Sequence, residues 1–135
     1  MGWIDKLLGR TWKTYFNKGE RYRADNEPGL AVHEYREALK IFDGSDDERT
    51  ALNAGLKAVR KVLHAQQMER AEAFRQAKQF DRAKDACESA SQHATDPQDE
   101  ANVQRMLTSL GLDSSEQARI LAEEHQRVSH ADADV

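Results

Sequence analysis

The chain has 135 residues, of which 39% are hydrophobic and 33% are charged, and its net charge is -4. This length suits a single domain with one modest core, and the large charged fraction is typical of thin helical arrays rather than of a thick, sheet-centred core. Because an acidic chain is repelled by nucleic acid, we expect no nucleic-acid partner.

The single cysteine, Cys87, has no partner in the chain for a disulfide, which fits a reducing compartment. The opening residues lack the unbroken apolar core of a secretory signal because Asp5 interrupts them. No stretch approaches the ~20 apolar residues that a membrane span requires. We therefore expect a cytoplasmic protein.

Residues 1–10 form a short amphipathic segment with Asp5 and Lys6 opposite an apolar side. One interpretation is a peripheral anchor that inserts into a lipid headgroup layer. The other is a short helix that packs on the first hairpin or contacts a protein, and it is favoured because the polar side is not richly basic. The docking patch predicted here consists of Trp3, Ile4, Leu7 and Leu8.

Residues 11–24 and 29–42 are predicted to form the first helical hairpin. Apolar residues recur three and four positions apart in both segments, as on one face of a helix. Between them, Asp25, Asn26 and Pro28 provide turn chemistry. Two helices joined by so few residues lie antiparallel.

Residues 46–78 keep a helical composition that only Gly55 interrupts, with Ser45 or Asp46 as the predicted cap. This segment is either one long helix or two helices that divide near His64, and the sequence favours the single helix. Residues 79–94 follow as the next predicted helix.

Two shorter helices are predicted beyond this point. Residues 97–110 form a helix that begins at Pro97 and stops at Gly111, because glycine readily takes the left-handed conformation. Residues 113–128 start with Asp113 and Glu116 in a pattern like a capping box, and their few apolar residues predict a weakly packed terminal cap. We place the single folded domain at residues 11–128 and expect the tail, residues 129–135, to be disordered.

Two of these segments match each other and resemble the tetratricopeptide repeat, a helical hairpin of about 34 residues. The first match carries small and aromatic residues at six pattern positions: Tyr15, Gly19, Tyr22, Ala31, Tyr35 and Ala38. The second is weaker, with Cys87 in place of an aromatic residue and Gln67 in place of the first large residue; its matching positions are Ala71, Phe74, Phe80, Ala83 and Ala90. The matches lie 52 residues apart, from Gly19 to Ala71, so residues 46–63 count as an extra helix or a helix extension that the family pattern lacks.

The resemblance implies an all-α, right-handed solenoid of about six helices, stacked as antiparallel hairpins. It also implies a concave surface, lined by the first helix of each repeat, that takes up a partner's peptide or helix. Carried over by position, the partner-binding residues are Lys13, Phe16, Asn17, Glu20 and Arg23 in the first repeat, and Met68, Glu69, Glu72 and Arg75 in the second. The chaperone-binding branch of the family clamps a terminal carboxylate with a lysine and an asparagine, but Phe16 and Glu20 stand at those positions here. The alternative is that these charged residues are simply solvated.

The sequence contains no pattern that is typical of catalysis, of a metal site or of a cofactor. His33 and Glu34 begin a zinc-protease-like motif, but Glu37 stands where the second histidine belongs. Cys87 lies among alanines on an apolar face, where burial makes a thiol inert. No glycine-rich phosphate loop is present.

From these observations we expect a non-catalytic adaptor or scaffold that binds another protein and needs no cofactor. Self-association through the exposed aromatic end is a further expectation. The alternative function is a helical regulatory or targeting subunit that docks on a membrane surface or a large assembly through residues 3–8.

Overall fold

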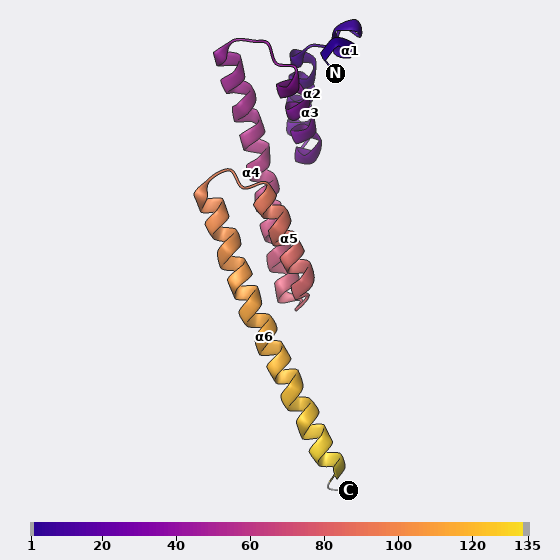
Figure 1. Ribbon diagram of the computed structural model, residues 1–135, viewed down its shortest axis with the longest axis vertical. Coiled ribbons are helices and arrows are strands. Elements are labelled where there is room, and N and C mark those ends of the chain that lie inside the picture. The colour runs from indigo at the N-terminus through magenta and orange to yellow at the C-terminus, as the bar shows by residue number, and fades with distance from the viewer. Residues whose placement is uncertain (1, 134–135) are drawn as a thin grey trace.

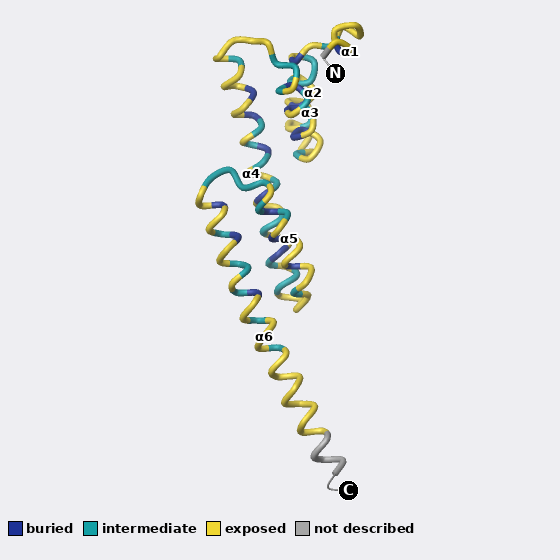
Figure 2. The backbone as a smooth tube through the Cα atoms, in the orientation of Figure 1, coloured by how far each residue is buried: buried dark blue, intermediate teal, exposed yellow. Residues whose placement is uncertain are grey.

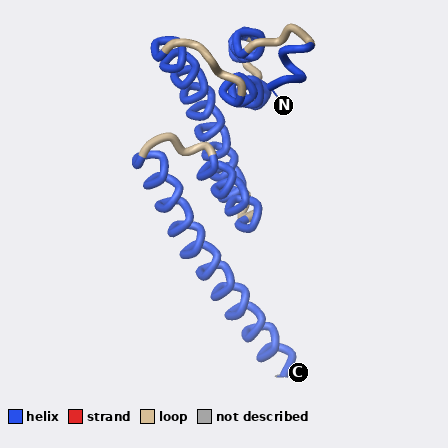
Figure 3. Tube along the Cα trace, turned by 45° about the horizontal axis from the view of Figure 1, so that its top comes forward, coloured by secondary structure: helices blue, strands red, loops and turns tan. Residues whose placement is uncertain are grey.

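The computed structural model describes residues 2–133, with the side chains of residues 3–128, and this part of the chain is all-α (Figure 1). Its helices are α1 (Gly2–Leu7), α2 (Trp12–Ala24), α3 (Pro28–Lys40), α4 (Asp46–Gln76), α5 (Phe80–Gln92) and α6 (Pro97–Ala133). Short loops join them, and no strand occurs within residues 2–133 (Figure 3). The predicted all-α fold is therefore confirmed, and its helices are consistent with the predicted stack of antiparallel hairpins.

The single long helix over residues 46–78 is confirmed as α4, a helix of 31 residues. Its start is fixed by Ser45, whose hydroxyl accepts a hydrogen bond from the backbone N–H of Glu48 at 3.2 Å. The Glu48 carboxylate in turn accepts one from the N–H of Ser45 at 3.0 Å. This reciprocal capping satisfies two backbone donors that the first turn of a helix leaves free.

The turns of the two hairpins have the same geometry, 52 residues apart. Asn26, between α2 and α3, has φ 58°, and Lys78, between α4 and α5, has φ 60°. In each turn the next residue donates its N–H to a carbonyl five residues earlier: Glu27 to Tyr22 at 2.8 Å, and Gln79 to Phe74 at 2.8 Å. These bonds satisfy carbonyls at the helix end and close the turn.

Residues 46–63 form the first half of α4, so of the two predicted possibilities they are a helix extension and not a separate extra helix. Asp46 begins α4 and Pro97 begins α6, each directly after a second helix of a hairpin. The buried residues of the two helices correspond 51 positions apart, with Leu52 matching Val103 and Val59 matching Leu110. The repeating unit therefore has three helices: α2, α3 and the first half of α4, then the second half of α4, α5 and the first half of α6.

The cores of the two units have residues of different size at equivalent positions. Tyr35 of α3 is fully buried, and a Cβ atom added to Gly19 of α2 or to Gly55 of α4 would meet its ring at 2.8 or 3.0 Å. In the second unit Cys87 takes the place of Tyr35, and Ala71 takes the place of Gly19. In the first unit a large residue of the middle helix packs against glycines, and in the second unit a smaller residue of the middle helix packs against alanine. This exchange of side-chain size keeps the spacing between the helices similar.

The helix α6 contradicts two predictions about the end of the chain. The predicted stop at Gly111 and the new start at Asp113 are wrong, because α6 continues unbroken from Pro97 to Ala133. Gly111 does not have a positive φ, which is the conformation that would end the helix. Residues 129–133 continue the helix, and residues 134–135 of the predicted tail lie outside the described residues. Figure 2 shows that α6 is largely exposed from Ser114 to Val128.

Candidate functional site

The predicted partner-binding residues of the first repeat are largely occupied by contacts within the chain. Phe16 is half-buried, with its ring 6.0 Å from the rings of Trp12 and of Tyr35. Glu20 accepts a hydrogen bond from the Tyr35 hydroxyl at 2.6 Å. Burial and this bond together raise the pKa of Tyr35 to about 12. Phe16 and Glu20 therefore stabilise the hairpin, which is a role that the sequence did not reveal.

The three other residues of this set lie on the surface of α2. The ammonium group of Lys13 is 3.8 Å from a carboxylate oxygen of Glu48, which ties the start of α2 to the start of α4. Asn17 and Arg23 are exposed. These residues form a polar surface on α2. Neither of the two grooves described below includes any of them.

Three of the four predicted residues of the second repeat, all except Glu72, line a groove between the second half of α4 and α6. Its volume is about 470 Å³, and we call it the Met groove. Met68 and Glu69 belong to the α4 wall, whereas Met106 and Arg105 belong to the α6 wall. The complete lining is His64, Ala65, Met68, Glu69, Arg75, Asn102, Arg105, Met106 and Ser109.

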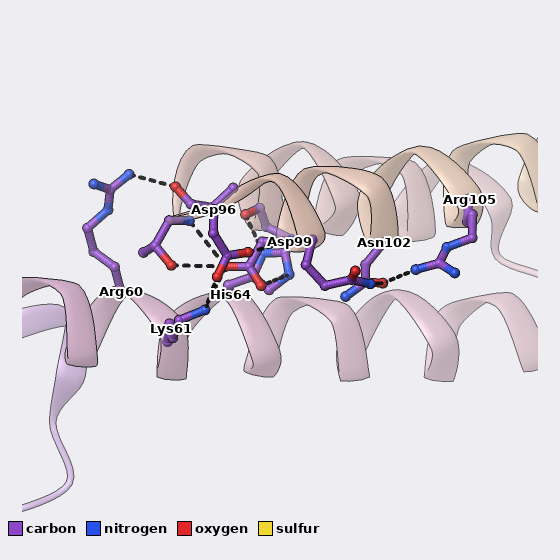
Figure 4. Close-up of polar contacts among 11 residues, drawn as sticks. Arg60, Lys61, His64, Asp96, Asp99, Asn102 and Arg105 are labelled. Carbon is purple, nitrogen blue, oxygen red and sulfur yellow. Dashed lines mark hydrogen bonds and ion pairs between the residues drawn. The ribbon is translucent and has the colours of Figure 1, made fainter.

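A set of polar contacts, the polar bridge, fixes one end of the Met groove (Figure 4). Lys61 of α4 donates to Asp96 at 2.6 Å, and the buried Asp99 accepts from the N–H and the hydroxyl of Thr95, each at 3.1 Å. The Nδ1–H of the buried His64 donates to the Ala90 carbonyl of α5 at 2.8 Å. The bridge therefore joins the middle of α4 to the end of α5 and to the first turn of α6.

The charges of the polar bridge support one another. The hydrogen bond to Asp96 raises the pKa of Lys61, and the same bond lowers the pKa of Asp96. Burial acts to raise the pKa of Asp99, but the hydrogen bonds from Thr95 and the nearby His64 outweigh it, so this pKa lies below its usual value. Both carboxylates are therefore held in the charged form, which keeps the α4–α6 spacing at this end of the groove.

A second cavity of about 570 Å³ continues past Arg75 toward the exposed half of α6, and we call it the Phe80 groove. Arg75 lines both grooves and donates to Asp113 at 2.6 Å and to Glu72 at 3.4 Å. These carboxylates raise the pKa of Arg75. The complete lining is Glu72, Arg75, Gln76, Lys78, Phe80, Asp113, Glu116, Gln117, Ile120, Leu121 and Glu124.

The structure separates the two sets of residues that the resemblance assigned to one concave surface. Neither the Met groove nor the Phe80 groove contains a residue of α2. The sequence identified the α4 wall of both grooves but missed the α6 wall. Met106 packs in part against the core of the second unit, and the hydrophobic pattern of α6 alone does not indicate which helix it faces.

The N-terminal patch is attached through its polar side. Asp5 is buried, and its carboxylate accepts a hydrogen bond from the Tyr15 hydroxyl at 2.7 Å and lies 3.2 Å from Nε of Arg10. The apolar side points away: Trp3 is 66% exposed, Leu7 76% and Leu8 63%. Ile4 is also exposed, at 38%. The segment is thus a short helix that contacts the first hairpin through Asp5, while its apolar side chains stay exposed.

Other chemistry is limited in the described part of the chain. Burial raises the pKa of the Cys87 thiol, which reduces its reactivity. Within residues 2–133, no three side chains of the kinds that bind metals lie together in a way that would hold an ion. None of the helices over the same residues is both long enough and apolar enough to cross a membrane.

The chain was compared with family models, with curated proteins and with solved structures, and none of them matches it.

Proposed function

We propose that this chain is a non-catalytic adaptor, of the type that the tetratricopeptide resemblance implies, and that it holds a segment of a partner protein in the Met groove. The observation that carries the proposal is the pair of methionines, Met68 and Met106, on the two walls of an open cavity of about 470 Å³. Methionine is flexible and polarizable, so it adapts to apolar side chains of varied shape, and protein-binding surfaces use it for that purpose.

The rest of the groove sets the chemistry of the partner. Glu69 on one wall and Arg105 on the other offer charges of both signs beside the methionines. A helix or an extended segment with one or two apolar anchors, flanked by charged residues of both signs, matches this lining. The polar bridge holds the walls apart before the partner arrives, which lowers the entropic cost of binding.

Blocking the groove tests the proposal. Asn102 lies in the groove lining, whereas Gln104, on the same helix, is exposed and outside it. Affinity capture with the wild-type chain identifies a partner, and the purified partner is then titrated against Asn102→Trp and against the control Gln104→Trp. We expect at least ~10-fold weaker binding for Asn102→Trp alone, because the indole fills the space of the partner's anchor. Equal affinities of the two variants would place the partner elsewhere.

A second candidate function is a regulatory or targeting subunit that docks through the N-terminal patch on a membrane surface or a large assembly. The exposure of Trp3, Leu7 and Leu8 favours it. Co-sedimentation with anionic vesicles tests the membrane form of this function, with the full chain compared with a variant that lacks residues 1–9. Equal sedimentation of the two would exclude the membrane.

A further inference from the structure

The second half of α6 lacks the cover that its counterpart in the preceding unit has. The second half of α4 is packed against α5, and its Ala71 is fully buried there. Within residues 2–133 no helix packs on the second half of α6 in the way that α5 packs on the second half of α4. Ile120 is 43% exposed, and Leu121 and Val128 are each 58% exposed.

The uncovered part of α6 forms one wall of the Phe80 groove. Ile120 and Leu121 of α6 and Phe80 of α5 give this groove its apolar surface. Four carboxylates line it, against two basic groups, and Arg75 is already paired with two of those carboxylates. The groove therefore suits a segment that combines apolar side chains with positive charge. Its acidic lining residues are Glu72, Asp113, Glu116 and Glu124.

The N-terminal patch has this complementary chemistry. Trp3, Leu7 and Leu8 are its most exposed apolar side chains. The charge of Asp5 is taken up by Arg10 within the same segment, and Lys6 on α1 and Lys18 on α2 add positive charge at this end. Over residues 1–23 there are six Lys and Arg residues against two acids, so the segment that carries the patch is basic.

The two surfaces lie at opposite ends of the elongated molecule, so one chain does not join them by itself. Figure 1 shows α1 at one end of the long axis and the second half of α6 toward the other. We propose that the Phe80 groove binds the N-terminal patch of a second copy of this chain. The contact is head-to-tail and leaves a free patch at one end and a free groove at the other, so it extends into chains or closes into rings.

This proposal does not depend on the Met groove, and it has its own experiment. Two full-length variants are made: Leu7→Glu/Leu8→Glu, which destroys the patch, and Leu121→Glu, which destroys the groove. Sedimentation velocity over a range of concentrations measures assembly of the wild type, of each variant and of their equimolar mixture. We expect assembly of the wild type, at least ~10-fold weaker self-association of each variant, and one-to-one dimers in the mixture that grow no further.

The mixture distinguishes this contact from every symmetric one. The Leu121→Glu variant keeps its patch and the Leu7→Glu/Leu8→Glu variant keeps its groove, so one intact contact forms between them. A two-fold contact between two patches, or between two α6 helices, would instead leave one variant assembling alone like the wild type, and that result would overturn the proposal. A wild type that stays monomeric up to about millimolar concentration would also overturn it.

A matched control separates this effect from misfolding and from non-specific loss of apolar surface. Val62 is an apolar residue of α4 that is 43% exposed and lies outside both grooves. We expect Val62→Glu to assemble like the wild type, and all variants to keep the wild-type circular dichroism spectrum. Added salt should weaken assembly, because opposite charges meet across the contact. Binding of the patch to anionic vesicles without assembly of the wild type would assign the patch to a membrane and refute the proposal.

Discussion

The contact between Tyr35 and Gly19 gives the sharpest quantitative prediction for this fold. A Cβ atom added to Gly19 would lie 2.8 Å from Cδ1 and Cε1 of the Tyr35 ring, whereas carbon atoms pack best at ~3.5–4.0 Å. The ring has little room to move away, because Gly55 of α4 lies against it as well. A Cβ atom added to Gly55 would be 3.0 Å from Cζ of Tyr35. The Tyr35 hydroxyl is also held by Glu20 at 2.6 Å.

The magnitude follows from two opposing effects. Replacing glycine by alanine inside a helix stabilises it by about 1 kcal/mol, but over-packing a filled site costs ~1–3 kcal/mol. Gly19→Ala should therefore lower the free energy of unfolding by up to about 2 kcal/mol. In a Tyr35→Leu background the ring is gone, and the same substitution should become neutral or stabilising.

Urea unfolding of the four proteins in this double-mutant cycle measures the coupling between the two positions. We expect a coupling of about 1–3 kcal/mol. If Gly19→Ala changes stability by the same amount in both backgrounds, the two residues do not constrain each other and the assigned helix contact is wrong.

Three further predictions concern the helices. Gly111→Ala should raise stability by about 1 kcal/mol in thermal unfolding, because no atom lies within 4 Å of the added Cβ inside α6; a loss would indicate a helix break there. Ser45→Ala should lower stability by ~1 kcal/mol through loss of the bond to Glu48, and Ser45→Asp should restore it. Asp99→Asn should lower stability by about 1–3 kcal/mol at neutral pH, because the buried carboxylate accepts two bonds from Thr95. The lowered pKa of Asp99 stabilises the fold above its ordinary value of 3.8 and ceases to do so as the pH falls through the folded-state pKa, so urea titrations should show the wild type and Asp99→Asn converging in strong acid.

Local chemistry predicted the helices well. The cap at Ser45, the turn after Ala24 and the apolar periodicity of α4 depend on neighbours in sequence, so they can be recognised without the fold. The close approach at Gly19 was also predictable, because a small residue beside aromatics is typical of tightly packed helical hairpins. The sequence alone shows Gly55 only as an interruption of a helical segment, whereas the structure places it against Tyr35 on the side opposite Gly19.

The features that the sequence did not predict depend on how helices far apart in the chain align with one another. Gly111 resembles a helix stop in sequence, but a glycine ends a helix only when its backbone turns left-handed, and α6 continues through it. The α4 wall of the Met groove was predicted from the repeat pattern. The α6 wall, with Arg105 and Met106, was not, because the alignment of two helices about 35 residues apart in sequence depends on packing of the whole unit.

The side chains of Met68 and Met106 provide the most direct test that the chain holds a partner in the Met groove. Both line the cavity, and the sequence has only three methionines, so a spectrum of the 13C-labelled methionine methyl groups is simple to assign. On addition of the partner, we predict that the methyl signals of Met68 and Met106 shift together and saturate at one equivalent, and that Asn102→Trp abolishes both shifts. A partner that binds while both signals stay in place would contradict the account.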